Sequence, residues 1–391
     1  MRIAYILLDP GIGVFGTKGA SVHVQEVGRT FRRLGHEVSV FCTRTDDDVP
    51  ADLTDLELTK LDVPKGLDRG QREISLLRLS DMLADLVVDT SLRTQEESGG
   101  SAGFDLVYER YSLFSSAGEQ ISDRLGVPLI MEVNAPLLDE QKQHRGLVHD
   151  EHAVRATARS FAGASRIVCV SSSVADWVRR DYPGLNDVSV VPNGVNTERI
   201  TPTVDRPSDT APVRIGFVGT LKPWHGTDRL VEACALLQGD FHLDILGHGP
   251  QSEALQDQAK ALRLGSRVSF HGAIAPEEVP DHLRTFDIAV APYPAGDNYF
   301  SPLKIYEYLA AGLPIVASAV GSIPEVLDVG ETALLVPPDD PQALAEALQT
   351  LIDDPRLRAR MGRAARDEAL ARHSWTSRCE QILESFVMEQ V

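Results

Sequence analysis

The sequence lacks three features that would place it in other classes of protein. No apolar run reaches the roughly 18 residues needed to cross a membrane. The four cysteines, Cys42, Cys169, Cys234 and Cys379, form neither a CxxC pair nor a Cys/His cluster with metal spacing, which predicts buried thiols and no metal site. Lysine and arginine number 38 against 57 acidic residues, and the net charge of −19 argues against a nucleic-acid partner.

The N-terminal segment MRIAYILLDPG carries an apolar run that stops at Asp9 and Pro10. This run is too short for a signal peptide, so we interpret it as a first strand. Together with the cysteine usage, it predicts a cytoplasmic protein with reduced thiols.

A length of 391 residues predicts two domains, because one hydrophobic core rarely serves so long a chain. In both halves, short β-branched runs alternate with helical segments, which predicts parallel strands joined by right-handed crossovers. The fold class is therefore α/β, with two Rossmann-like doubly wound sheets in tandem. The boundary is expected between residues 193 and 212, and the last helix near Trp375. The expected strands are 3–8, 38–44, 105–111, 128–133, 166–171 and 188–192, then 213–221, 241–247, 267–273, 287–293, 314–318 and 333–337.

Loops at the carboxyl ends of parallel strands are the usual ligand sites in such sheets. In GTLKPWHG (219–226), Gly219 follows a strand and Lys222 offers a point charge to a phosphate. A plain turn with solvated Lys222 and His225 is the alternative. The loop GHGPQSE (247–253) lacks the third glycine of a dinucleotide fingerprint, and we interpret it as a tight strand-to-helix turn.

The stretch SPLKIYEYLAAGLP (301–314) predicts a short helix over 302–311, with Ser301 as N-cap and Gly312 at its end. Lys304 lies in the first turn, where a cation opposes the helix dipole at a cost of about 0.3–1 kcal/mol. Glu307 follows three residues later on the same face. These two charges suit a diphosphate and a ribose, whereas an ion pair between them is the alternative.

These motifs, with VPNGVNTERI (191–200) and LLVPPDDPQALAEAL (334–348), resemble the retaining glycosyltransferases of family four, which have the two-domain GT-B fold. The resemblance covers nearly the whole chain. It implies an acceptor-binding domain at 1–196, a nucleotide-sugar-binding domain at 197–374, a cleft between them, and a helix at 375–391 that packs back on the first domain. It implies a UDP-sugar donor most readily, small-molecule substrates, and no cofactor or metal.

The resemblance assigns roles residue by residue. Glu307 holds the ribose, main-chain groups at 301–303 meet the phosphates, and Lys222 and Lys304 carry the phosphate charge; these three side chains are the catalytic candidates. Three positions depart from the family pattern: Tyr299 stands where a second glutamate is usual, and Thr220 and His225 stand where an arginine and a lysine are usual. The full set of expected donor-binding residues is Gly16, Gly219, Thr220, Lys222, His225, Gly272, Ala273, Tyr299, Ser301, Pro302, Leu303, Lys304 and Glu307.

The acceptor is expected at the segments YERY (108–111) and EVNAPLLDEQ (132–141), which follow strands of the first domain. An acidic lining favours an amine-bearing acceptor such as an aminocyclitol or amino sugar, with a glycan as the other option; ordinary pairing of these charges with their neighbours is the alternative. The expected acceptor-binding residues are Lys18, His23, Glu109, Arg110, Glu132 and Asn134.

Retention without an enzymic nucleophile implies front-face attack, in which cations and helix dipoles stabilise the departing diphosphate. Two other functions stay open for this architecture. One is a nucleotide-sugar epimerase, and the other is a catalytically silent nucleotide-sugar-binding protein.

Overall fold

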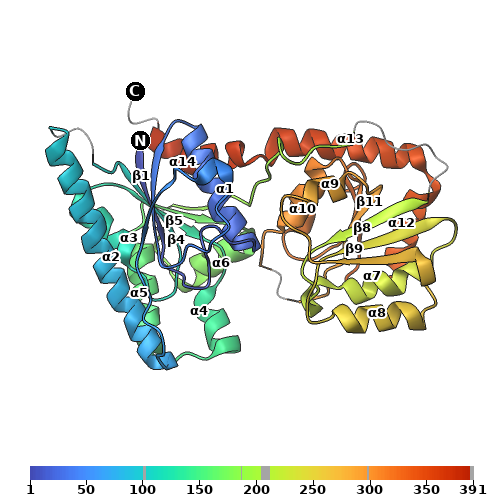
Figure 1. The fold of residues 1–391 in the computed structure, drawn as a ribbon, viewed down its shortest axis with the longest axis horizontal. Coiled ribbons are helices and arrows are strands. Elements are labelled where there is room, and N and C mark those ends of the chain that lie inside the picture. Colours follow the sequence, from blue (N-terminus) through green and yellow to red (C-terminus); the bar gives the residue numbers. More distant parts are fainter. Residues whose placement is uncertain (100–102, 186, 204–211, 297–298, 388–391) are drawn as a thin grey trace. The chain divides into compact units, whose positions relative to one another are not determined.

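The computed structural model describes residues 1–99, 103–185, 187–203, 212–296 and 299–387 (Figure 1). The chain forms two compact units, Met1–Pro192 with Cys379–Val391, and Asn193–Arg378. The sequence puts the first boundary after residue 196 and the start of the returning helix at 375. In unit 1, the Arg166 guanidinium donates to the carbonyls of Gln381 and Ile382 at 3.1 and 3.2 Å, which holds the end of the last helix on this unit.

Unit 1 is a parallel sheet of seven strands in the order β3-β2-β1-β4-β5-β6-β7. Each of the six strands predicted from the sequence is present. The seventh, β3, is a half-exposed edge strand of sequence ELTK, which has no apolar pattern to reveal it. The elements are β1 (Arg2–Leu7), α1 (Gly19–Arg33), β2 (Glu37–Cys42), η1 (Ala51–Leu53), β3 (Glu57–Lys60), α2 (Arg69–Glu97), β4 (Leu106–Arg110), α3 (Ala117–Leu125), β5 (Leu129–Val133), α4 (Leu137–Glu140), η2 (Gln141–Arg145), α5 (Asp150–Ala162), β6 (Arg166–Cys169), α6 (Ser172–Asp181) and β7 (Val188–Val190).

Unit 2 is a parallel sheet of six strands in the order β10-β9-β8-β11-β12-β13, and all six were predicted from the sequence. Asp340 caps α12, since its side chain accepts from the Ala343 amide at 2.9 Å. The elements are β8 (Val213–Val218), η3 (Pro223–His225), α7 (Thr227–Cys234), β9 (Phe241–Leu246), α8 (Ser252–Ala261), η4 (Gly265–Arg267), β10 (Val268–Gly272), α9 (Val279–Leu283), β11 (Ile288–Ala291), α10 (Leu303–Ala310), β12 (Ile315–Ser318), α11 (Ile323–Val326), β13 (Ala333–Val336), α12 (Pro341–Asp353) and α13 (Pro355–Arg372). The last helix, α14 (Trp375–Val387), begins in unit 2 and belongs to unit 1 from Cys379 onward.

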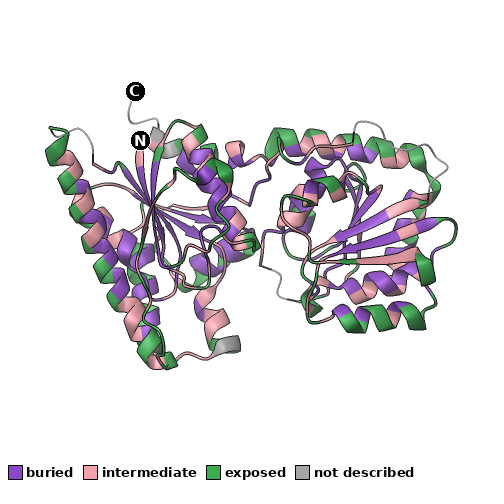
Figure 2. Ribbon diagram, in the orientation of Figure 1, coloured by how far each residue is buried: buried purple, intermediate pink, exposed green. Residues whose placement is uncertain are grey.

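Helices cover both faces of each sheet, so the central strands are buried along most of their length (Figure 2). This explains why those strands are continuous runs of Val, Ile, Leu and Ala and do not alternate with polar residues.

The strand order reverses between β1 and β4 in unit 1, and between β8 and β11 in unit 2. The loops that leave the carboxyl ends of the strands at such a point diverge and leave room for a ligand. In unit 1 these are residues 8–18 and 111–116. In unit 2 they are residues 219–226 and the loop that precedes α10.

Candidate functional site

The loops after β8, β9 and β11 pack on one another through glycines. A Cβ on Gly247 would lie 1.9 Å from the carbonyl oxygen of Gly219, and one on Gly226 would lie 1.8 Å from that of Pro292. Gly226 also has a φ of +65°, which disfavours other residues. The glycines of GHGPQSE therefore serve loop packing, in agreement with its interpretation as a tight turn.

Lys304 reaches from α10 to the loop after β8. Its Nζ lies 2.9 Å from where a Cβ on Gly219 would stand, 4.3 Å from the Phe217 ring centroid and 5.0 Å from that of Tyr293. The side chain is partly exposed as a whole, but Nζ is shielded from solvent and has no hydrogen-bond partner among the described residues. The alternative of a Lys304–Glu307 ion pair is therefore wrong.

Burial lowers the pKa of the Lys304 amine to about 7, against a smaller opposing effect of Glu307. A buried amine without a partner costs folding free energy, and a diphosphate is the kind of ligand that would offset the cost. Lys304 is thus poised for an anion that the protein itself does not provide.

His225 lies beside Lys304 but does not act as a cation. Burial, and then the charge of Lys304, lower the pKa of His225 to about 4, so the ring is neutral at pH 7. Its Nδ1 donates to the Thr220 carbonyl, which leaves Nε2 as an acceptor. His225 therefore adds no positive charge to this loop at pH 7.

Lys222 belongs to the same loop, and its Nζ lies 4.7 Å from the ring centroid of Trp224. Trp224 itself is 54% exposed. Lys222 is partly exposed and Thr220 is exposed, so both remain accessible to a ligand.

Helix α10 begins one residue later than predicted, and its N-cap is Pro302. Ser301 does not cap the helix, because its Oγ accepts from the Asn193 amide at 3.1 Å and contacts the Tyr306 hydroxyl at 3.0 Å. Glu307 lies one turn further along the helix and is partly buried. The remaining predicted donor residues have the following exposure: Gly272, Tyr299 and Leu303 are partly buried, Ala273 is exposed, and Pro302 is buried.

Four of the predicted acceptor residues meet in one buried network in unit 1. The Glu132 carboxylate accepts from Arg110 at 2.7 Å and from Tyr108 and Asn134, and it lies 2.9 Å from His23 Nε2. Burial alone would raise the pKa of Glu132, but His23 and Arg110 hold it well below its ordinary value. The structure brings these four predicted acceptor residues together, and their polar groups satisfy one another.

Glu109 is also buried, and its carboxylate accepts from the Gly118 amide at 2.8 Å and from the Ser115 hydroxyl. Burial raises the pKa of Glu109 to about 7. Its observed contacts hold the first turn of α3, as the pairing alternative described.

The N-terminal loop places Gly16 where a Cβ would lie 2.7 Å from Ser21 Oγ and 2.8 Å from Asp46 Oδ2. The loop is also held by Gln25, whose Nε2 donates to the carbonyls of Val14 and Gly16 at 3.0 and 2.9 Å. Lys18 stands exposed at the start of α1.

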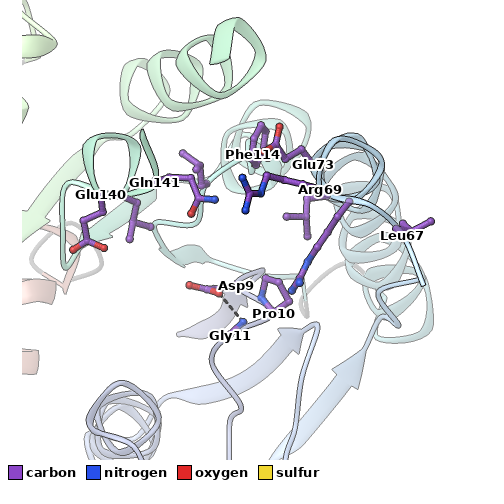
Figure 3. Close-up of a pocket in the computed structure, with 13 residues that line it drawn as sticks. Asp9, Pro10, Gly11, Leu67, Arg69, Glu73, Phe114, Glu140 and Gln141 are labelled. Carbon is purple, nitrogen blue, oxygen red and sulfur yellow. Dashed lines mark hydrogen bonds between the residues drawn. The ribbon is translucent and has the colours of Figure 1, made fainter. Parts of the chain in front are cut away.

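A cavity of about 460 Å³ opens at the strand-order reversal of unit 1 (Figure 3). Its walls come from the loops after β1, β4 and β5 and from the first turns of α2. Phe114, in its wall, has a φ of +72°, a strained value for a bulky residue. The lining residues are Asp9, Pro10, Gly11, Leu67, Arg69, Arg72, Glu73, Leu76, Leu113, Phe114, Leu137, Glu140 and Gln141.

Some charged side chains of this cavity have hydrogen-bond partners and others have none. Glu73 is buried and accepts from the amides of Val148 and His149 at 2.7 to 3.2 Å. The side chains of Arg69 and Arg72 make no ion pair or hydrogen bond in the part of the chain that the structure describes. Both stand in the first turns of α2, where cations oppose the dipole.

Sequence reasoning missed this pair of arginines. The signal available was the spacing of three residues in DRGQRE at a helix start. Within the described ranges, no group of three or more His, Cys, Asp or Glu side chains could hold a metal ion, and no helix is long and apolar enough to cross a membrane.

Two parallel-sheet units in tandem, each with a strand-order reversal where a ligand could bind, are the architecture of the GT-B fold. The chain matches "Glycosyltransferase Family 4" over residues 17–199 and "Glycosyl transferases group 1" over residues 212–354, and it belongs to this family of glycosyltransferases. The fold class and family predicted from the sequence are confirmed.

Curated relatives agree with this assignment. The chain is 29% identical to the D-inositol 3-phosphate glycosyltransferase of Streptomyces avermitilis over 94% of this chain and 81% of the relative. It is 28% identical to the protein of the same name from Corynebacterium efficiens, over 98% and 94%. The prediction of a glycosyltransferase is thus confirmed, and neither the epimerase nor the silent binding protein gains support.

Solved structures show the same fold. Anabaena Alr3699/HepE in complex with UDP aligns with a TM-score of 0.73 at 19% identity, over 99% of this chain and all of that one. Sucrose-phosphate synthase from Thermosynechococcus elongatus aligns with a TM-score of 0.70 at 20% identity, over 99% and 98%.

Proposed function

We propose that this glycosyltransferase moves a hexosyl group from a UDP-sugar to a small acceptor that carries an anionic group, with retention of configuration. The observation that carries the donor half is the shielded, unpartnered amine of Lys304 at the strand-order reversal of unit 2. The UDP complex of the fold neighbour favours uridine as the base. Lys222 and the amides of Ser301 and Leu303 would share the diphosphate with Lys304, and Glu307 would accept from the ribose hydroxyls.

Front-face attack suits these residues. The bond between C1 of the sugar and the β-phosphate oxygen breaks, and the acceptor oxygen bonds to C1 on the same face. The acceptor proton passes to the departing diphosphate, so the protein supplies charge stabilisation in place of a general base. We propose no cofactor or metal for this step; activity that persists after EDTA treatment would support that.

The acceptor half of the proposal rests on the cavity of unit 1. An amine-bearing acceptor was expected from acidic side chains, but Glu109 and Glu132 are buried and already bonded to donors of their own. The charges without a partner are Arg69 and Arg72, whose planar donors suit a phosphate or carboxylate. The phosphate in the names of the curated relatives' substrate agrees with this chemistry. An aminocyclitol, an amino sugar or a glycan fits the proposal only if it carries such a group.

The donor half is tested by a panel of nucleoside diphosphates and their sugars in a thermal-shift assay, since a ligand that binds only the folded state raises its stability. UDP and one UDP-sugar should stabilise the wild-type protein. Glu307→Ala should lose most of that shift, and an unchanged shift would refute the role of Glu307.

The acceptor half is tested with an inositol phosphate, free inositol and an aminocyclitol as acceptors. Only the phosphorylated compound should be glycosylated well. Arg69→Met and Arg72→Met should each raise its KM about 10- to 100-fold, the loss of a charge-assisted hydrogen bond of roughly 1.5–3 kcal/mol. Arg78→Met is the matched control, because Arg78 is exposed on the same helix but does not line the cavity. Equal use of neutral and phosphorylated acceptors would refute the anionic class.

A further inference from the structure

The chain passes between its two units twice, and both passages meet inside unit 2. Asn193 is the first residue of this unit and Arg378 is the last. Between them, the Val195 amide donates to the His373 carbonyl at 2.8 Å, and the Trp375 amide donates to the Val195 carbonyl at 3.2 Å. The two passages are therefore bonded to each other through their backbones.

The residue before the donor helix is fastened to the first passage. The Asn193 amide donates to Ser301 Oγ at 3.1 Å, and Asn193 Nδ2 donates to the Ser301 carbonyl at 2.9 Å. Ser301 Oγ also lies 3.0 Å from the Tyr306 hydroxyl. All three residues are buried, so these bonds are protected from competition by water.

Tyr306 also contacts the second passage, through His373. Its ring packs on the His373 imidazole at a centroid distance of 5.1 Å, and His373 Nδ1 accepts from Arg378 Nη2 at 2.6 Å. Burial and then Arg378 lower the pKa of His373 to about 4, which keeps the ring neutral and able to accept this bond. One buried chain of contacts thus runs from Ser301 through Tyr306 and His373 to Arg378.

We infer that Tyr306 and His373 are positioning residues that couple the phosphate-binding turn at Ser301 to both passages between the units. This inference rests on the proposed function, because it takes residues 301–303 as the place where the diphosphate binds. A packed apolar core would need none of these polar groups, each of which costs free energy to bury. These buried contacts connect a ligand at Ser301 to the backbone at 193–195 and 373–378.

Hydrogen–deuterium exchange of the full-length protein with and without UDP tests this coupling. The amides of Asn193, Val195 and Trp375 report on the coupling directly, because each of them donates one of the hydrogen bonds that join Ser301 to the first passage or the two passages to each other. UDP should slow exchange at 193–196 and 373–378 about fivefold or more, the lower end of typical coupling between sites. It should also slow exchange in the loop at 219–226, which reports donor binding itself.

Tyr306→Phe removes only the hydroxyl and keeps the ring. It should still bind UDP with a Kd within about threefold of wild type, with slowed exchange at 219–226, but it should lose the UDP-induced slowing at 373–378, because Asn193 keeps its own bonds to Ser301 and only the link through Tyr306 is removed. Tyr308→Phe is the matched control: it lies on the same buried helix, its hydroxyl accepts from the Val218 amide at 3.0 Å, and it is outside the chain. That variant should keep the slowing at 373–378.

Slowed exchange at 219–226 in the wild-type protein without any change at 193–196 and 373–378 would overturn the coupling while leaving the donor site intact. Retained slowing in Tyr306→Phe would overturn the role of Tyr306. No UDP effect anywhere would overturn the proposed donor, and the inference with it. The wild-type comparison decides the matter even if Tyr306→Phe fails to fold.

Discussion

Replacing Lys304 by methionine should raise the stability of the protein and weaken donor binding at the same time. A pKa lowered from 10.5 to about 7 means that folding disfavours the charged amine by roughly 5 kcal/mol. Relaxation and water penetration reduce such penalties, so we expect Lys304→Met to raise the free energy of unfolding by about 2–4 kcal/mol at pH 6. Methionine fills the same volume and carries no charge to desolvate.

The sign of the pH dependence follows from the direction of the shift. Because the pKa of Lys304 is lower in the folded state, the penalty is full below about pH 7 and fades as the pH rises from there to 10.5. The gain from Lys304→Met should therefore shrink across this window. Urea unfolding of both proteins at pH 6 and pH 9.5 measures it.

Donor binding should respond in the opposite direction. A diphosphate recharges the amine, so Lys304→Met should weaken binding of a UDP-sugar about 10- to 100-fold. In the wild-type protein, affinity should fall as the pH rises above 7, since the free protein must then take up a proton; the variant should lack this dependence. Titration calorimetry in buffers of different ionisation enthalpy detects the proton. A variant that is less stable at pH 6, or that binds the donor as well as wild type, would refute the reasoning.

Further predictions concern the supports of the two sites. Gly226→Ala should lower the unfolding free energy by more than about 2 kcal/mol in urea titrations, because a Cβ would meet the Pro292 carbonyl at 1.8 Å; an unchanged midpoint would contradict the loop packing. Glu109→Gln can keep both bonds of the carboxylate. Because the pKa of Glu109 is raised from 4.5 to about 7, this carboxyl stabilises the wild-type fold fully below pH 4.5, and the stabilisation disappears as the pH rises through 7. The unfolding free energy of Glu109→Gln should not fall in this way between pH 4.5 and pH 7.

The fold could be predicted from the sequence because its main signals are local. Continuous apolar runs between amphipathic helices mark buried parallel strands, and Gly312 marked the end of α10 correctly. The edge strand β3 could not be found, because its side chains are half exposed and polar. Ser301 was misread as an N-cap because its true partner, Asn193, is 108 positions away.

The candidate sites were predicted less completely, because burial and pairing depend on the whole fold. The sequence predicted Arg110 and Glu132 as acceptor-binding residues in segments that follow strands of the first domain, yet it could not show that they satisfy one another. The sequence also failed to reveal Arg69 and Arg72 as site residues. They look like ordinary surface residues, and only the folded loops after three strands place them in the wall of a cavity.

At the proposed donor site, the cation Lys304 comes from α10 and not from the loop after β8. The loop after β8 carries Thr220 and His225 where the family usually has two cations, and His225 is neutral here. Lys304 approaches from α10 and contacts the same two aromatic rings as His225, those of Phe217 and Tyr293. Burial first, and then the charge of Lys304, lower the pKa of His225, and a neutral ring at this position adds no repulsion to the Lys304 amine. His225→Lys in the wild-type protein should accordingly lower its unfolding free energy. The same substitution in the Lys304→Met variant should be tolerated and should recover part of the lost donor affinity.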